Sequence, residues 1–186
     1  MASFFLTFLA LARFLVIGRT VMPWLYPMAA FGLTVAIVLS VETGMLMSLI
    51  LTILTVFGHP RDMELALFYI LPTLAGIFVI GRARRVSSFL GAGAVVSLVG
   101  VAMVLIFRIG DSFTDWLGIV SLTASAVFNG LASGTLSILF EYIFSSVLDI
   151  PTALQLMDIS RPDHPLLQQV LQTMPGSYQH SLQVSN

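Results

Sequence analysis

Long runs of apolar residues, separated by short polar stretches, make up most of the chain. We distinguish six runs, at about residues 3–18, 24–40, 43–57, 65–80, 88–108 and 117–140. The stretches between them collect most of the charges and contain Gly or Pro, which favour turns. Apolar runs of this kind predict helices that cross a membrane, although several are shorter than the usual ~20 residues. The pattern therefore predicts an all-α, polytopic membrane helix bundle of about six transmembrane helices over residues 1–148.

The composition supports this interpretation. Of the 186 residues, 58% are hydrophobic and 9% are charged, and none is a lysine. Soluble domains carry about 25% charged residues. Charge is costly inside a bilayer, so we expect lipid to surround the helices. The formal net charge of -1 provides no basic face for phosphates and argues against nucleic acid as a partner. The absence of cysteine excludes disulfides and thiolate chemistry.

The first apolar run, "MASFFLTFLALARFLVIG", also has the length of a signal peptide. A signal peptide begins with a positively charged region, and no such region precedes this run. We therefore interpret the run as the first membrane span.

The stretch "GRARRVSS" predicts how the spans are oriented. It contains Arg82, Arg84 and Arg85, the one cluster of arginines in the chain. Short basic loops stay on the cytoplasmic side of a membrane. Alternation along six spans then places both chain ends in the cytoplasm. The sequence thus predicts a multi-pass membrane protein with a cytoplasmic C-terminus.

Few polar side chains fall within the spans, and Arg13 and Asn129 are the clearest of them. Glu42 falls in a short loop, and Glu141 falls near the inner end of the last span. A transport or proton-relay pathway needs several converging ionisable groups, which this set does not provide. We expect Arg13 to extend to a membrane interface and Asn129 to form a hydrogen bond between helices.

The last span carries a stripe of small residues. Ala126, Gly130 and Gly134 recur every four residues, and such a stripe lets another helix approach closely. We expect the partner helix to belong to the same chain. A contact between two copies, and with it a homo-oligomer, stays open as the alternative.

A polar tail containing prolines begins at Asp149. Residues 149–176 are interpreted as a cytoplasmic connector with an amphipathic helix. The apolar residues of that helix follow helical spacing: Leu166, Leu167, Val170, Leu171 and Met174.

Ser177 is a candidate N-cap for a further helix that carries His180. Two short helices cannot bury enough surface to form a domain. We therefore expect the chain to be truncated, with residues 177–186 as the first turns of a missing domain.

The tail and the span before it resemble a known family. The likeness is carried by "NGLASGTL", "LFEYIF" and "GRARRVSS", and in the tail by "DHPLL", "PGSYQHS" and "VSN". These stretches resemble the bacterial seven-transmembrane receptors with an intracellular HD hydrolase domain. The usual junction of that family reads Asp/Asn-x-His-Pro-Leu-Leu, then Pro-Gly-Thr-Tyr-His-His-Ser and Val-x-Asn. The resemblance implies that the chain holds the last six of seven spans, followed by the beginning of an all-α HD domain.

The resemblance also implies a function for the full-length protein. Characterised members hydrolyse cyclic di-AMP, so the implied substrate is a cyclic dinucleotide that binds in the missing HD domain. It further implies a bacterial cell (inner or plasma) membrane, a possible extracytoplasmic ligand, and two divalent metal ions in the HD domain, with Mn or Fe as the expected metals.

His180 occupies the position of the family's first metal-ligand histidine. Gln179 stands where the family often has a second histidine beside it. The remaining ligands are absent from the chain, so we expect this chain by itself to hold no metal and to be no enzyme. We expect His59 and His164 to take no part in metal binding.

Two other functions stay open from the sequence alone. A small transporter component would need paired polar residues within the spans. A non-catalytic membrane anchor would dock a partner through the apolar face of the helix over residues 166–174. In the receptor interpretation, "LDIPTALQLMDIS" is the one covalent route from the last span to the HD domain, and we expect it to transmit the signal.

Overall fold

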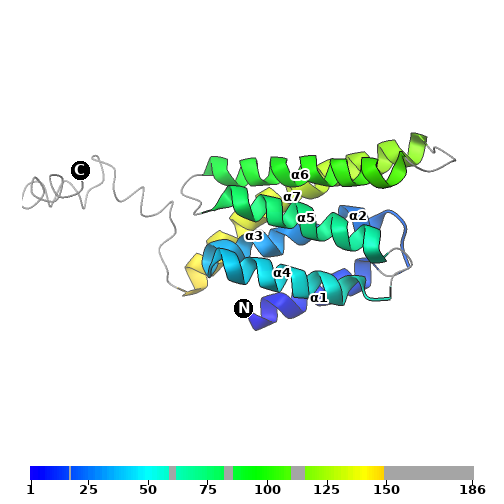
Figure 1. The fold of residues 1–186 in the computed structure, drawn as a ribbon. Coiled ribbons are helices and arrows are strands. Elements are labelled where there is room, and N and C mark those ends of the chain that lie inside the picture. Colours follow the sequence, from blue (N-terminus) through cyan, green and yellow to red (C-terminus); the bar gives the residue numbers. More distant parts are fainter. Residues whose placement is uncertain (17, 59–61, 82–85, 110–115, 149–186) are drawn as a thin grey trace, which may run out of the picture.

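The structure is a computed structural model, and it describes residues 1–16, 18–58, 62–81, 86–109 and 116–148. The regular structure of these residues is helical throughout, as the sequence predicts. The helices are α1 (Ala2–Val16), α2 (Met22–Leu25), α3 (Met28–Val38), α4 (Val41–Val56), α5 (Asp62–Ile80), α6 (Val86–Arg108) and α7 (Trp116–Leu148). Figure 1 shows them packed side by side as a bundle.

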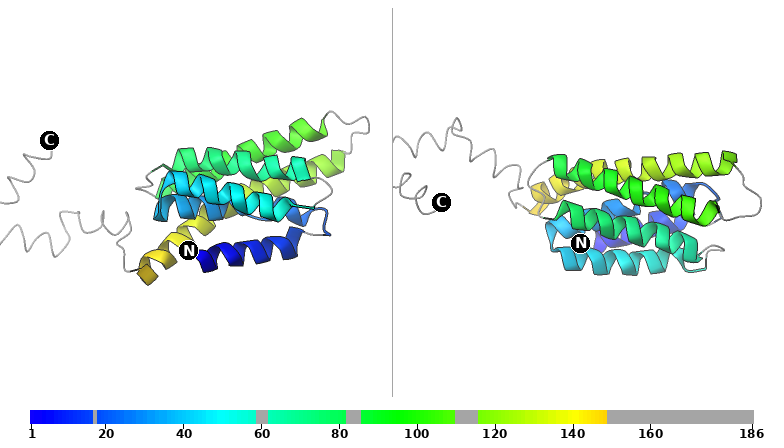
Figure 2. Two further views of the ribbon diagram at one scale, coloured as in Figure 1. Left: turned by 60° about the horizontal axis from the view of Figure 1, so that its bottom comes forward. Right: turned by 45° about the horizontal axis from the view of Figure 1, so that its top comes forward.

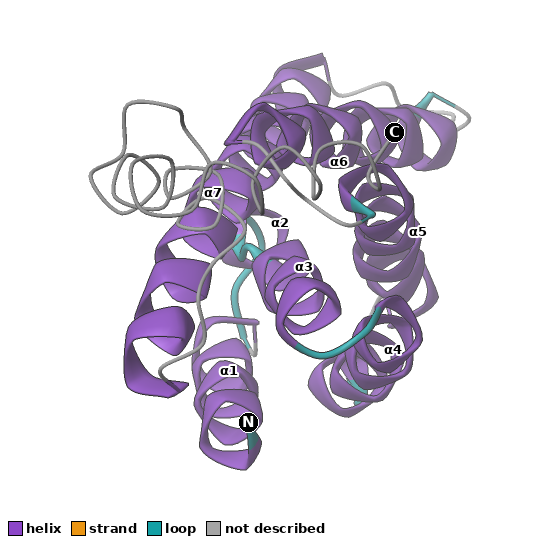
Figure 3. Cartoon of the chain, turned by 90° about the vertical axis from the view of Figure 1, so that its left-hand side faces the viewer, coloured by secondary structure: helices purple, strands orange, loops and turns teal. Residues whose placement is uncertain are grey.

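The helix α3 lies at the centre of the bundle. In the end-on view of Figure 3, α1, α4, α5, α6 and α7 surround it. Every residue from Met28 to Ala36 is buried, which explains why α3 is apolar on all sides. The surrounding helices leave many large Leu, Ile, Val and Phe side chains exposed on their outer sides. Because soluble proteins rarely expose so much apolar surface, this exterior fits contact with lipid.

Three helices are long and apolar enough to cross a membrane: Met63–Ile80, Ser87–Arg108 and Trp116–Val147. Three apolar stretches are shorter: Ala2–Val16, Met22–Val38 and Val41–Val56. Each of the six predicted spans corresponds to one of these stretches. The structure therefore shows an apolar helix bundle with three candidate spans, and it does not establish six crossings.

The second predicted span is a broken helix. Tyr26 and Pro27 separate α2 from α3. Tyr26 has an extended backbone, with φ −67° and ψ 116°, and Pro27 has ψ 64°. Proline cannot donate a main-chain hydrogen bond, and it disfavours the helical conformation of the residue before it. The apolar pattern predicts one continuous span over residues 24–40 and does not indicate this interruption.

The last helix is longer than the sequence analysis predicted. It has 33 residues, where the apolar pattern indicated a span over residues 117–140. At about 1.5 Å per residue, α7 is roughly 50 Å long. A bilayer core is ~30 Å thick, so part of α7 must extend beyond it if the helix crosses the membrane.

The start of α1 and the end of α7 lie at the same end of the bundle, as Figures 1 and 2 show. The end of α5 and the start of α6 lie there too. This is the arrangement that alternation predicts for the spans on either side of "GRARRVSS".

Residues 82–85 and 149–186 are outside the described part of the chain. The connector, the amphipathic helix and the role of His180 therefore stay predictions.

The small-residue stripe of α7 packs against α6 of the same chain. A Cβ atom on Gly130 would overlap the Oγ and main-chain nitrogen of Ser97 and would lie 2.6 Å from the main-chain oxygen of Gly93. The Ser97 hydroxyl donates a hydrogen bond to the carbonyl of Val127 at 3.0 Å, which joins the two helices. The expectation of packing within one chain is confirmed.

Candidate functional site at the break between α2 and α3

The break leaves two main-chain carbonyls without helical partners. In a continuous helix, the carbonyl of Pro23 would accept from residue 27, but Pro27 has no N–H. The N–H of Met28 donates to the carbonyl of Tyr26 at 2.8 Å and is not available to Trp24. A buried carbonyl without a donor costs about 1–3 kcal/mol. A broken helix inside a membrane bundle therefore needs donors from its neighbours.

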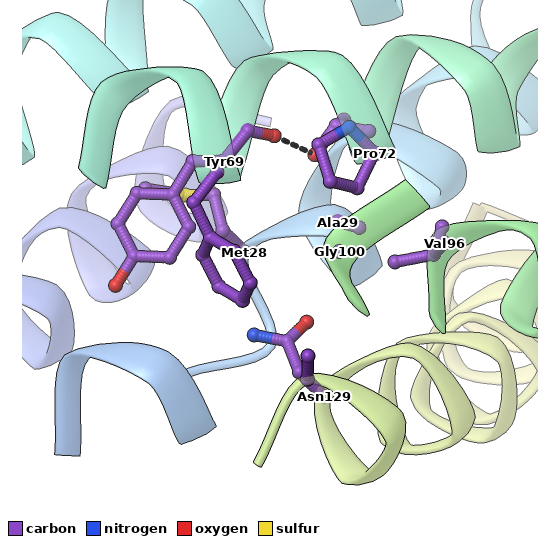
Figure 4. A pocket seen from close by; sticks show the side chains of 10 residues that line it. Met28, Ala29, Tyr69, Pro72, Val96, Gly100 and Asn129 are labelled. Carbon is purple, nitrogen blue, oxygen red and sulfur yellow. Dashed lines mark hydrogen bonds between the residues drawn. The ribbon is translucent and has the colours of Figure 1, made fainter. Parts of the chain in front are cut away.

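Two side chains from other helices supply these donors. The hydroxyl of Tyr69 on α5 donates to the carbonyl of Pro23. The amide Nδ2 of Asn129 on α7 donates to the carbonyls of Trp24, at 3.1 Å, and Tyr26, at 2.7 Å. Tyr69 and Asn129 are both buried. Figure 4 shows the amide of Asn129 pointing from α7 toward the segment between α2 and α3. Asn129 thus forms the hydrogen bond between helices that the sequence predicted.

Contacts from α1, α5 and α6 hold the same segment. The hydroxyl of Tyr26 donates to the carbonyl of Phe8 on α1 at 2.8 Å. The ring of Trp24 meets the ring of Phe68 edge to face, with centroids 4.7 Å apart, and the Arg108 guanidinium lies 5.9 Å from the Trp24 ring centre. We call the residues that hold this segment the α2 clamp: Phe8, Phe68, Tyr69, Arg108 and Asn129.

A largely buried ion pair adjoins the α2 clamp. Nη2 of Arg108 lies 3.1 Å from Oε1 of Glu64, and the two side chains are 17% and 14% exposed. Breaking an ion pair that is shielded from water is strongly destabilising. The pattern of apolar runs does not indicate that Glu64 and Arg108 meet, because they lie 44 positions apart in the sequence.

The other polar residues named from the sequence lie elsewhere. Arg13 is exposed and donates to the carbonyl of Phe57 at the end of α4, at 3.1 Å. Glu42 is exposed in the first turn of α4. Glu141 is buried on α7. Among the described residues, no hydrogen bond or ion pair links Arg13, Glu42, Asn129 and Glu141 to one another.

A small pocket lies beside Asn129 and is shown in Figure 4. Its cavity volume is about 10 Å³, which is about the space of one water molecule. It is lined by Met28, Ala29, Phe68, Tyr69, Pro72, Thr73, Val96, Gly100, Ala126 and Asn129. The hydroxyl of Thr73 is occupied, because it donates to the carbonyl of Tyr69 at 2.6 Å. Pockets for organic ligands usually measure about 300–1,000 Å³. This pocket is too small for a nucleotide, and we assign it no substrate.

No cluster of three or more His, Asp or Glu side chains that could hold a metal ion occurs within the described ranges. His59, His164 and His180 all lie outside those ranges. The predicted metal ligand, His180, is therefore not placed by the structure.

Comparison with known proteins identifies the family. The sequence model of the family described as "7TM receptor with intracellular HD hydrolase" matches residues 1–152. The chain belongs to this family. The resemblance drawn from the sequence is thereby confirmed. The α2 clamp falls entirely within the matched region of this 7TM–HD receptor family.

Two curated relatives bear the name cyclic-di-AMP phosphodiesterase PgpH. The protein from Bacillus subtilis (strain 168) is 26% identical over 170 residues, which cover 88% of this chain and 24% of the relative. The protein from Listeria monocytogenes serotype 1/2a (strain 10403S) is 26% identical over 168 residues, which cover 88% of this chain and 23% of the relative. The chain spans about a quarter of the length of these relatives. No solved structure matches it.

One sequence signal for the α2 clamp was available and was missed. The stretch "PWLYPM" places Pro27 four residues after Pro23, so the carbonyl of Pro23 loses its helical donor. This spacing predicts a break in the helix and a carbonyl that needs a hydrogen-bond donor from a side chain. The identity of that side chain, Tyr69, has no signal in the sequence, because only the packing of α5 against α2 brings it close.

Proposed function

We propose that this chain is the membrane-sensor portion of a longer, metal-dependent HD phosphohydrolase that hydrolyses cyclic di-AMP. The match of residues 1–152 to the 7TM–HD receptor family carries the proposal. The names of the two relatives, both cyclic-di-AMP phosphodiesterases, support the substrate. The lipid-compatible exterior of the bundle supports the membrane location.

In this proposal the six helical stretches of residues 1–148 each cross the bacterial cell (inner or plasma) membrane. Residues 149–176 form the cytoplasmic connector, and residues 177–186 begin the HD domain. The common position of the start of α1, the α5–α6 ends and the end of α7 supports this topology. The proposed topology has residues 82–85 and the tail on the cytoplasmic side.

Cysteine labelling tests the topology directly, because the native chain has no cysteine. Thr20 and Ser87 are both exposed, with Thr20 between α1 and α2 and Ser87 in the first turn of α6. The end of α1 and the start of α6 lie at opposite ends of the bundle (Figure 1). A membrane-impermeant maleimide should label Thr20→Cys in intact cells, and should label Ser87→Cys only after permeabilisation. The reverse pattern would refute the proposed orientation.

We propose His180 as the first metal ligand of the HD domain. Imidazole and carboxylates together suit Fe, Mn or similar metals, and two such ions can activate water for attack on a phosphodiester. In the full-length protein, His180→Ala should lower both the metal content and cyclic di-AMP hydrolysis. Gln179→Ala, at the neighbouring position, is the matched control and should lower neither. Equal metal content in the two variants would contradict the assignment.

The connector from α7 to the HD domain is proposed to transmit an extracytoplasmic signal. Support comes from the length of α7, which carries the helix to residue 148, where the connector begins. Replacing "LDIPTALQLMDIS" by a Gly/Ser linker of equal length should uncouple hydrolysis from the signal. An unchanged response would rule out this route.

The experiment that tests the whole proposal is to sequence the genomic DNA beyond codon 186 and to assay the full-length product. We expect an open reading frame that continues into a His-Asp pair, and hydrolysis of cyclic di-AMP that depends on a divalent metal. A stop codon directly after Asn186, with no hydrolysis, would leave the membrane anchor as the better interpretation.

A further inference from the structure

Pro72 lies inside α5 and removes one main-chain hydrogen bond from that helix. The carbonyl of Phe68, four residues earlier, would accept this bond in a regular helix. Within the part of the chain that the structure describes, no side chain donates to this carbonyl instead. In a membrane bundle, the carbonyl that a proline leaves without its donor is satisfied by neighbouring groups or by ordered water. The carbonyl of Phe68 is therefore one acceptor that needs a donor from outside α5.

The side-chain oxygen of Asn129 is a second acceptor. The amide Nδ2 of this residue uses both of its hydrogens, because it donates to the carbonyls of Trp24 and Tyr26. Its Oδ1 can accept two hydrogen bonds. The hydroxyl of Ser133 lies 3.4 Å from Oδ1, beyond the range of about 2.5–3.0 Å for a normal O–H···O bond. Figure 4 shows this oxygen on the side of Asn129 that faces Gly100. Oδ1 therefore has the capacity to accept from a closer donor.

The pocket beside Asn129 brings these two acceptors together. Phe68, Pro72 and Asn129 all line it. A helix carbonyl points along its helix toward the residue four positions later, so the carbonyl of Phe68 points toward Pro72 in the pocket wall. The cavity volume is about 10 Å³, which is about the space of one water molecule. A molecule of that size in the pocket therefore lies within reach of both acceptors.

We propose that one water molecule binds in this pocket and donates one hydrogen to the carbonyl of Phe68 and the other to Oδ1 of Asn129. The chemistry of the pocket selects water, because both groups only accept and water offers two donors. The hydroxyl of Thr73 is a further acceptor in the wall, since its own hydrogen is donated to the carbonyl of Tyr69. A calcium or magnesium ion takes at least six oxygen ligands, more than these groups supply.

The bound water joins two irregular points of the bundle. Pro72 interrupts the hydrogen bonds of α5, and Asn129 holds the break between α2 and α3. A water that bonds at both places gives α5 and α7 a polar contact in the interior of the bundle. Bridging waters of this kind are nearly as favourable in enthalpy as a direct hydrogen bond. The proposal uses contacts within the bundle alone, so it does not depend on the proposed hydrolase function.

Gly100 offers a way to remove the water without disturbing the helices around it. It lines the pocket, and a Cβ atom on it would lie 3.4 Å from the ring of Phe68 and 3.5 Å from the Cβ of Ala126. These are ordinary contacts, so the methyl group of G100A fits but takes space that the water needs. A Cβ atom on Gly91, in the same helix, meets no atom within 4 Å, and Gly91 does not line the pocket. G91A is therefore the matched control.

Nuclear magnetic resonance of the chain in detergent micelles can detect the water directly. The asparagines of the chain are Asn129 and Asn186, so isotope labelling of asparagine gives two side-chain amide signals, and N186Q identifies them. We expect cross-relaxation between water and the amide protons of Asn129 in the native protein and in G91A. We expect G100A to lose it. The cross-relaxation should persist in a buffer without sodium or potassium, because the ligand is water.

Unfolding equilibria give a second, independent measurement. G100A and G91A gain the same helix propensity, so the ratio of their unfolding constants reports the effect of filling the pocket. We expect this constant to be about tenfold higher for G100A, which corresponds to ~1.4 kcal/mol and to a buried carbonyl that has lost its donor. P72A restores the main-chain N–H that serves the carbonyl of Phe68. In the P72A background, the ratio should therefore fall below about threefold.

Three results would overturn the proposal. The first is an Asn129 amide signal without cross-relaxation to water in both the native protein and G91A. The second is cross-relaxation that stays unchanged in G100A, which would assign it to a water outside this pocket. The third is cross-relaxation that disappears without sodium or potassium, which would assign it to a hydrated cation. If P72A does not accumulate in membranes, the magnetic resonance result decides by itself.

Discussion

The hydroxyl of Tyr69 donates a hydrogen bond to the main-chain carbonyl of Pro23, from α5 to α2. This side chain takes the place of the N–H that Pro27 lacks. Asn129 performs the same task for Trp24 from α7. The carbonyls left without donors at the break between α2 and α3 therefore accept hydrogen bonds from two helices that lie far from it in the sequence. Each of these contacts can be removed by a single substitution.

Removing the Tyr69 hydroxyl should destabilise the bundle. Tyr69→Phe keeps the ring but leaves the buried carbonyl of Pro23 without a donor, so we expect the free energy of unfolding to fall by about 1–3 kcal/mol. Unfolding in mixed micelles measures this change. Tyr142→Phe is the control, because Tyr142 is 66% exposed and its substitution should have little effect. Equal stability of the two variants would contradict the role of Tyr69.

Restoring the main-chain donor should weaken the dependence on Tyr69. Pro27→Ala supplies an N–H at the position that would serve the carbonyl of Pro23 in a continuous helix. We expect Tyr69→Phe to destabilise the Pro27→Ala protein by less than half as much as the native protein. A double-mutant cycle of unfolding free energies gives this comparison. Strictly additive effects would show that the two residues do not serve the same carbonyl.

Two glycine substitutions should separate the close contact of α6 and α7 from general effects on a helix. Gly130→Ala puts a Cβ atom onto Ser97 and should destabilise the protein by about 1–3 kcal/mol through overpacking. Gly91→Ala meets no atom within 4 Å and should stabilise α6 by up to about 1 kcal/mol. Thermal unfolding of both variants checks the difference in sign, and a loss of stability in both would argue against it.

The pair of Glu64 and Arg108 should show a coupling free energy. Each single variant, Glu64→Gln or Arg108→Gln, breaks an ion pair that is mostly shielded from water, and we expect each to destabilise the bundle by about 2 kcal/mol or more. The double variant should destabilise it by less than the sum of the two. Arg19→Gln is the control, since Arg19 is exposed and should contribute little. A coupling of zero would mean that the ion pair adds nothing to stability.

The positions of the helices could largely be predicted from the sequence, because a bilayer imposes a simple constraint on each of them separately. Apolar runs must be helical to satisfy their own main chain, and charges collect where the runs end. The packing stripe of Ala126, Gly130 and Gly134 and the bonding role of Asn129 followed from the same local rules. The junction motif around His180 identified the family, which the match over residues 1–152 confirms.

The tertiary structure decided which groups satisfy one another. The sequence contains Pro27, but only the packing of the helices reveals that Tyr69 and Asn129 donate hydrogen bonds to the carbonyls at the break. The pairing of Glu64 with Arg108 likewise requires α5 and α6 to lie side by side. The apolar pattern defines each helix by its own contact with lipid. Hydrogen bonds and ion pairs between helices depend on their relative rotation and height, which no single stretch of sequence specifies.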